Sequence, residues 1–282
     1  MKVEEFKDIL YEKDEATGIV MVTLNAPKRK NAMSFITNLE LFYAVQAMEE
    51  DDGARAMIIT GAKDPDSDDP TKEAFSSGGY FTPKLFTDIP EETRKEIDLT
   101  DLAQIKLCLK MFNFEKPVVA AINGMAIGAG FTMPLSGADL IYMSEHAWIE
   151  FPFVGRLGIL PEFALTYFLP RLMGFQKAKE IVFFPKRIPA QQALEWGWVN
   201  EVVPHDELIP RAQEIARKLI APEGPGLAVR LAKRAFHQPY IDAVTKALDV
   251  ENQGLGQTMK SHDFGEGMKA RKEKRPPVFK GE

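Results

Sequence analysis

The order of predicted elements indicates an α/β fold, in which a strand-rich core is followed by a region of helices alone. Two observations support this class. Up to about Pro204, short β-branched runs alternate with segments whose apolar residues recur at helical spacing. From Asp206 onward the chain shows helical patterns and no strand pattern. We therefore predict a core over residues 1–204 and a helical region over residues 205–282.

The predicted elements of the core follow from periodicity, β-branched runs and turn residues. Strands are expected at residues 9–13, 19–24, 56–60, 118–122, 140–143 and 148–151, with a turn and strand at 197–203. Helices are expected at residues 33–48, 98–112, 129–135, 161–169, 178–184 and 189–196. Residues 80–94 carry mixed charge and two prolines and are predicted to form a mobile loop.

Composition limits the functions that are possible. The chain has 282 residues, 45% of them hydrophobic, and a formal net charge of −6, which disfavours general nucleic-acid binding. Cys108 is the only cysteine, so a reducing, cytoplasmic setting is expected. The N-terminal segment has acids where a signal peptide needs an apolar core. Four histidines without ligand spacing argue against a metal site.

The stretch from Lys116 to Met143 carries the first functional signal. A buried strand is followed by the turn Asn123-Gly124, then by Gly128-Ala129-Gly130 and a helix expected to begin near Ala129. Glycines let a backbone press against a ligand. The free N–H groups of a helix N-terminus can hold an oxygen that is becoming negative.

Two other interpretations of this stretch are less favoured. No charged residue occurs from Pro117 to Ala138, so the segment could be taken for a membrane span. Its polar residues and four glycines favour a buried core element, and no membrane association is expected. The Gly128-x-Gly130 pair lacks the third glycine of a dinucleotide-binding fingerprint, because Met133 stands there.

A second glycine-rich approach occurs at Ser77-Gly78-Gly79, which alone could be an ordinary turn. Together with three other segments it resembles the crotonase superfamily of enoyl-CoA hydratases and isomerases. The four segments occur in the family's order and are Pro27–Met33 (PKRKNAM), Phe75–Gly79 (FSSGG), Asn123–Gly130 (NGMAIGAG) and Phe264–Gly267 with Glu273–Phe279 (EKRPPVF).

The resemblance implies a spiral of ββα units with a C-terminal helical trimerisation region, assembled as a homotrimer or a dimer of trimers. It also implies an acyl-CoA thioester as substrate, with no separate cofactor. The thioester oxygen would be held by the backbone N–H groups of Gly79 and Ala129. Coenzyme A would be met by Lys28, Arg29 and Ala32, by the Ser77-Gly78 turn, and by Lys274; alternatively, both basic clusters are solvated charge runs.

The identity of the acid residues favours one reaction of the family. The two positions that carry the glutamates of family hydratases are Thr132 and Phe153 here. Glu162, in Gly158–Glu162 (GILPE), resembles the single glutamate of family isomerases. Aromatic neighbours such as Phe163 would favour its protonated form. Alternatively, Glu162 only complements a helix dipole in a first turn.

The leading hypothesis is therefore an enoyl-CoA isomerase in which Glu162 shuttles a proton from C2 to C4. The alternatives are an enoyl-CoA hydratase that uses Glu162 with another group, and a non-catalytic CoA-binding subunit. The acyl group is not readable from the sequence. Residues that could line its pocket, or simply form core, are Phe81, Leu85, Phe86, Phe151, Phe153, Phe163 and Tyr167.

Overall fold

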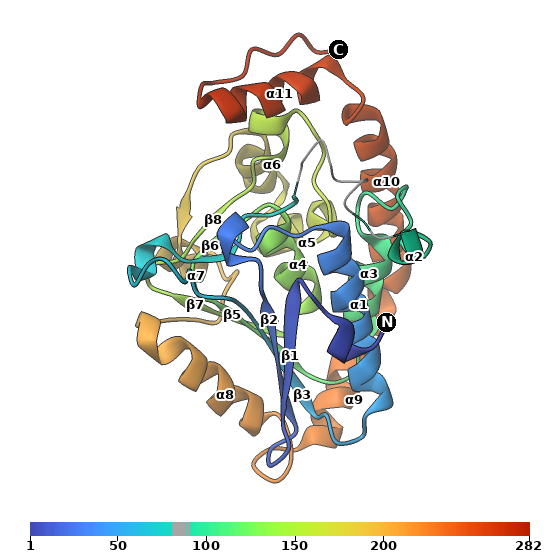
Figure 1. Ribbon diagram of the computed structural model, residues 1–282, viewed down its shortest axis with the longest axis vertical. Helices are drawn as coiled ribbons and strands as arrows, with labels where there is room; N and C mark the ends of the chain where they lie inside the picture. Colours follow the sequence, from blue (N-terminus) through green and yellow to red (C-terminus); the bar gives the residue numbers. More distant parts are fainter. Residues whose placement is uncertain (81–88, 90) are drawn as a thin grey trace.

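The computed structural model describes residues 1–80, 89 and 91–282 and contains two β-sheets (Figure 1). The larger sheet has six strands in the order β1-β2-β3-β5-β7-β10, and the smaller has four in the order β4-β6-β8-β9. The larger sheet consists of β1 (Ile9–Asp14), β2 (Ile19–Leu24), β3 (Ala56–Gly61), β5 (Val118–Ile122), β7 (Leu140–Ser144) and β10 (Glu201–Val203). The smaller consists of β4 (Ala74–Ser76), β6 (Met125–Ile127), β8 (Trp148–Glu150) and β9 (Ile188–Pro189).

The chain alternates between the two sheets. β3, β5 and β7 lie in the larger sheet, and each is followed by a strand of the smaller one, β4, β6 and β8. Neighbouring strands are parallel except for β1 with β2 and β8 with β9. This alternation, with helices after the strand pairs, confirms the expected ββα spiral.

Helices cover both faces of the larger sheet, whose central strands β3 and β5 are buried throughout. One face is covered by α8 (Figure 1). Leu208 and Ala212 of this helix join a core cluster with residues of β3, β5 and β7. The helices are α1 (Phe35–Glu50), α2 (Glu91–Arg94), α3 (Ile105–Asn113), α4 (Ala129–Gly137), α5 (Leu165–Met173), α6 (Phe175–Phe183), α7 (Ala190–Glu195), α8 (Leu208–Lys218), α9 (Gly226–His237), α10 (Ile241–Thr258) and α11 (His262–Glu273).

The C-terminal helices pack on the rest of the chain. Val244, Leu248 and Leu255 of α10 belong to the main hydrophobic cluster, and α11 packs against the π-helical turn Phe153–Leu157. The division at residue 204 stays a prediction. Within the described ranges, no helix combines the length and the apolar character needed to cross a bilayer.

Several predicted elements differ from the structure. The helix expected at 98–112 begins only at Ile105, because the Asp101 carboxylate accepts hydrogen bonds from the N–H groups of Ile105 (2.6 Å) and Lys106 (3.0 Å) and caps the helix there. The turn at Asn123-Gly124 leads into the short strand β6 rather than directly into α4. The expected loop at 80–94 lies mostly outside the described residues, and its end forms α2.

The helix expected at 161–169 also begins later, at Leu165. Phe163 and Ala164 have φ values of 57° and 55°, which helical residues do not adopt, so Glu162 precedes the helix instead of opening it. Pro170 lies inside α5, which continues to Met173 rather than ending at the proline.

Candidate active site

A cavity of about 1140 Å³ brings together residues from separate parts of the chain. Its wall includes Gly79 after β4, Ala129 at the start of α4, and Glu162 before α5. The C-terminal helix α11 and the segment after it, including Lys274, close another part of the wall. Residues that lie far apart in the sequence thus face one cavity of a size suited to a small-molecule ligand.

The Gly79 amide is oriented by the neighbouring Met33. Met33 N–H donates to Gly78 O (2.8 Å), and Tyr80 N–H donates to Met33 O (2.8 Å), which makes an isolated parallel bridge. Because alternate peptide groups of an extended segment point in opposite directions, the Gly79 N–H faces away from Met33. Among the described residues it has no hydrogen-bond partner.

The Ala129 amide is the first N–H of α4 and is likewise unpartnered within the described ranges. Gly128 has a φ of 53° and donates its N–H to Glu150 O (2.9 Å), which fixes the turn that starts the helix. The N–H groups of Phe131 and Thr132 bond to Gly128 O. Ala129 therefore presents a free donor at the positive end of the helix dipole.

The two glycine-rich backbones lie in direct contact. Gly78 has a φ of +84°, and a Cβ atom placed on it would be 2.4 Å from Ile127 O and 3.6 Å from Ala129 N. Only a residue without a Cβ permits this approach. The loop that carries Gly79 is thereby packed beside the turn that carries Ala129, and both amides line the same cavity.

The Glu162 carboxyl group has an unusual environment. Burial, and to a smaller extent the negative charge of Glu251, together raise its pKa to about 8. Glu251, on α10, is fully buried. Its carboxylate accepts hydrogen bonds from Ala164 N (2.8 Å), Thr166 N (2.8 Å) and Thr166 Oγ1 (2.7 Å), so it caps the N-terminus of α5.

Thr132 and Phe153 stand where family hydratases carry their two glutamates, and they lie in different surroundings. Phe153 lines the cavity, and its ring lies 3.5 Å from where a Cβ atom on Gly128 would stand. Thr132 is fully buried and is absent from the cavity wall. Its Oγ1 has no hydrogen-bond partner among the described residues. Neither side chain supplies a carboxylate to the cavity.

The expected coenzyme A residues are divided between two places. Ser77, Gly78 and Lys274 line the cavity, whereas Lys28, Arg29 and Ala32 do not. Lys28 is exposed and Ala32 is buried.

Arg29 is held near the cavity by its own contacts. Its guanidinium pairs with Asp8 (2.5 Å) and lies over the Tyr80 ring, with Cζ 4.8 Å from the centroid. Its carbonyl oxygen accepts a hydrogen bond from Ser77 Oγ (3.2 Å), so the basic loop borders the Ser77–Gly79 loop.

Several cavity residues were missed by sequence reasoning. Glu150, at the end of β8, is a second carboxylate in the cavity wall, and its Oε1 pairs with Arg156 Nε at 2.5 Å. Arg187 also lines the cavity and lies over the Trp148 ring, 4.3 Å from its centroid. Glu150 and Arg187 lie far apart in the sequence, so no local sequence pattern predicts that they line the same cavity.

The aromatic candidates for the acyl pocket separate into three groups. Phe153 lines the cavity. Phe151, Phe163 and Tyr167 are buried in the main hydrophobic cluster instead. Phe81, Leu85 and Phe86 lie outside the described residues.

Comparison with known proteins identifies the relatives of this chain. Residues 14–282 match the family model described as enoyl-CoA hydratase/isomerase. A short-chain-enoyl-CoA hydratase of Clostridium acetobutylicum is 33% identical over 271 residues, which cover 96% of this chain and 97% of the relative. A 1,2-epoxyphenylacetyl-CoA isomerase of Escherichia coli is 28% identical, with 94% and 95% covered.

A solved structure agrees with this likeness. The crystal structure of an enoyl-CoA hydratase/isomerase from Pseudoalteromonas atlantica superposes with a TM-score of 0.81 at 25% identity, and covers 97% of this chain and 100% of that one.

Proposed function

Because the chain belongs to the enoyl-CoA hydratase/isomerase family, an enzyme family that acts on acyl-CoA thioesters, we propose that it moves a double bond from C3 to C2 of an enoyl-CoA. In this reaction Gly79 and Ala129 hold the thioester oxygen, and Glu162 carries the proton. The observation that supports it most is the cavity that contains all three groups, with a carboxyl group whose pKa is raised to about 8.

The proposed steps follow from the chemistry of the thioester. The Glu162 carboxylate removes a proton from C2, and the electron pair moves onto the carbonyl oxygen to give an enolate. The amides of Gly79 and Ala129 stabilise that oxygen by hydrogen bonds, and the loss of one such donor typically costs about 2.7–4 kcal/mol of barrier. The carbonyl then re-forms, the double bond moves to C2–C3, and Glu162 returns the proton to C4.

The replacement of Glu162 by glutamine tests this assignment. The E162Q variant keeps the size of the side chain but has no base, so turnover of a 3-enoyl-CoA should fall by roughly a thousandfold or more. Acyl-CoA binding should persist, because the amides and the cavity remain. Retention of wild-type turnover by E162Q would remove Glu162 from the mechanism.

Hydration of a 2-enoyl-CoA is the second candidate, and Glu150 favours it. Glu150 gives the cavity a second carboxylate, as water addition by an acid and a base requires. Its Oε1 atom is already occupied by Arg156 Nε, which leaves one carboxylate oxygen fewer to contact a water molecule. Incubation of a 2-enoyl-CoA in oxygen-18 water separates the two reactions, since labelled 3-hydroxyacyl-CoA forms only by hydration.

We also propose that Lys274 and Lys28 contact the phosphates of coenzyme A. Lys274 lines the cavity and Lys28 is exposed on the loop that carries Arg29, whereas Arg29 already has Asp8 as its partner. Each lysine-to-alanine change should raise KM for acyl-CoA and leave kcat nearly unchanged, because phosphate binding is equal in the ground and transition states. An unchanged KM in both variants would contradict this role.

The proposed assembly is a homotrimer or a dimer of trimers. Apolar side chains of α9 and α10 remain exposed in one chain, among them Leu227 (65%), Leu231 (46%), Phe236 (75%) and Val250 (59%). Exposed apolar faces of this kind are typical of subunit contacts. Sedimentation equilibrium of the L227E/L231E double variant should give a smaller species than the wild type; equal masses would contradict the proposal.

A further inference from the structure

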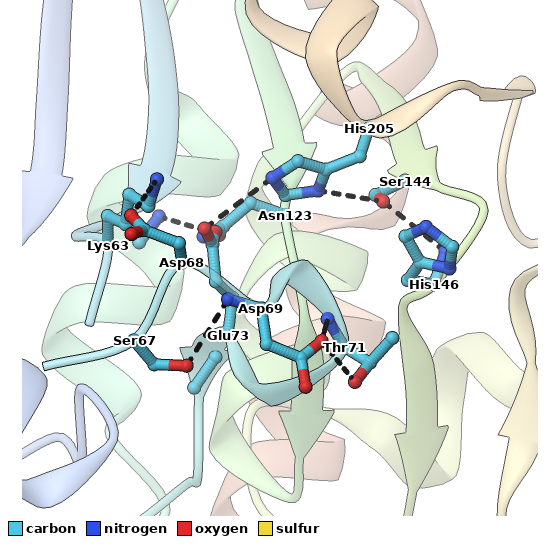
Figure 2. A network of polar contacts seen from close by, with 12 residues as sticks. Lys63, Ser67, Asp68, Asp69, Thr71, Glu73, Asn123, Ser144, His146 and His205 are labelled. Atoms are coloured by element: carbon cyan, nitrogen blue, oxygen red, sulfur yellow. Dashed lines mark hydrogen bonds and ion pairs between the residues drawn. The ribbon is translucent and has the colours of Figure 1, made fainter.

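A buried polar network outside the cavity joins the strands that lead to the two amides (Figure 2). Glu73 immediately precedes β4, Asn123 lies in the turn between β5 and β6, and His205 follows β10. None of these three residues lines the cavity wall formed by the described residues. The network therefore has no direct access to a substrate there.

The Glu73 carboxylate is the centre of the network. Asn123 Nδ2 donates to Glu73 Oε2 (2.9 Å), and His205 Nε2 lies 3.5 Å from Glu73 Oε1. The other ring nitrogen of His205 is 3.1 Å from Ser144 Oγ, at the end of β7, as Figure 2 shows. The Glu73 side chain is only 5% exposed, and a buried carboxylate is costly unless such partners satisfy it.

The strands held by this network are weakly joined by their own backbones. β4 and β6 pair only at Ala74 with Met125 and at Ser76 with Ala126, and the register shifts between the two pairs. Gly79 follows β4 and Ala129 follows β6 closely, so a displacement of either strand changes the spacing of the two amides. Oxyanion stabilisation depends steeply on that spacing.

The backbone at the start of the two strands supports the same contact. Met125 N–H donates to Glu73 O (3.1 Å). A Cβ atom on Gly124 would lie 2.2 Å from Glu73 O, so this glycine lets the turn pack directly on Glu73. Side-chain and main-chain contacts of Glu73 thus meet at the point where β4 begins.

We propose that Glu73 and His205 are positioning residues for the enolate-forming reaction. Held between Asn123 and His205, the Glu73 carboxylate fixes β4 against β6 and β7, and through them the Gly79 amide against the Ala129 amide. The proposal rests on the proposed function, because it assigns the network to the oxyanion site. His205 acts by placing its Nε2 atom 3.5 Å from Glu73 Oε1, and an apolar side chain of equal size offers no polar atom there.

Methionine and glutamine at position 205 provide the matched test. Both resemble histidine in reach, but only glutamine keeps an N–H donor for Glu73. H205M should lower kcat about tenfold or more, with KM within about twofold of wild type, since a transition-state interaction is lost. H205Q should stay within about threefold of the wild-type kcat.

An infrared measurement reads the oxyanion site directly. A saturated acyl-CoA, labelled isotopically at its thioester carbonyl, should show a lowered carbonyl stretching frequency when bound to wild type, because two donors polarise the C=O bond. H205M should lose part of this shift and H205Q should retain it. His146 donates its backbone N–H to Ser144 Oγ (3.3 Å), and its ring lies beside that of His205, with the centroids 6.3 Å apart. Because the backbone N–H is kept in H146A and this ring does not contact Glu73, H146A is the control and should match wild type.

The outcomes separate the two proposals. Wild type without a carbonyl shift would overturn the oxyanion assignment itself. If the carbonyl shift in H205M is as large as in wild type, whether or not kcat falls, the positioning role is overturned. If H205M does not fold, E73Q decides: it keeps the size of Glu73 but removes its charge, and an unchanged shift and kcat in folded E73Q would overturn the proposal.

Discussion

At the residue scale, the carboxyl group of Glu162 links the proposed reaction to pH. A base must be ionised to remove the C2 proton, and the pKa of Glu162 is raised to about 8. The value of kcat/KM should therefore rise about tenfold per pH unit below pH 8 and level off above it. A pH–rate profile with a 3-enoyl-CoA checks this; a rate that falls as the pH rises toward 8 would contradict it.

The second carboxyl group should control the position of that profile. The negative charge of Glu251 raises the pKa of Glu162, so E251Q should move the inflection of kcat/KM to lower pH. The glutamine can still accept one hydrogen bond at the start of α5, which limits structural change. An inflection that does not move would show that burial alone sets the pKa of Glu162.

Gly78 is the residue whose backbone most constrains the site. A methyl group there would meet Ile127 O at 2.4 Å, and its φ of +84° is strained for alanine. G78A should lower the free energy of unfolding by about 2–4 kcal/mol and reduce kcat. G256A is the control, because nothing lies within 4 Å of its added methyl group on helix α10; it should stabilise by about 0.5–1 kcal/mol. Denaturant titration of both variants measures the difference.

The role of a single residue could be predicted from the sequence where it depends only on its neighbours in the chain. Gly78 marks a close backbone approach and Gly128 a turn with positive φ, and both are features that glycine-rich segments predict. Glu251 was not foreseen as a partner of Glu162, because only the folding of α10 onto α5 brings the two together. Glu150 was missed for the same reason, since its place in the cavity depends on how β8 pairs with β6.

At the scale of helices and strands, regular spacing of apolar residues predicted the long elements well. Short or strained segments were not predicted. The three residues of β6 are too few for a period. The start of α5 depends on Phe163 and Ala164 in a left-handed conformation that neither residue type favours. That turn is fixed by tertiary contacts, among them the bond from Phe163 N–H to Ala103 O (3.2 Å).

An ion pair connects α9 to the larger sheet and should be important for stability. Lys233 Nζ contacts Asp139 Oδ2 (2.8 Å), which also accepts the Val118 N–H (2.7 Å), and the lysine side chain is 4% exposed. K233M keeps the volume but leaves Asp139 without its cation, so we expect a loss of about 3 kcal/mol. K177A removes an exposed pair with Glu180 and should cost less than about 1 kcal/mol. Equal effects of the two changes on urea unfolding would contradict this difference.

At the scale of the whole molecule, the raised pKa values predict how stability depends on pH. Glu162 and Glu251 have pKa values raised to about 8 and about 7, against an ordinary value of 4.5. The native state therefore binds these protons more tightly than the unfolded chain does. Their contribution to stability is fully present below pH 4.5 and is lost as the pH rises from there to about 8.

The E162Q variant isolates this contribution, because glutamine does not titrate. Relative to wild type, E162Q should gain stability between pH 5 and pH 8.5, by an amount on the order of 3 kcal/mol. Urea unfolding of both proteins across this range measures the difference, and titrating groups that do not interact with Glu162 cancel in the comparison. A difference that stays constant with pH would mean that Glu162 has an ordinary pKa. Its carboxyl group would then be ionised at neutral pH, and kcat/KM of the proposed reaction would not depend on its titration near pH 8.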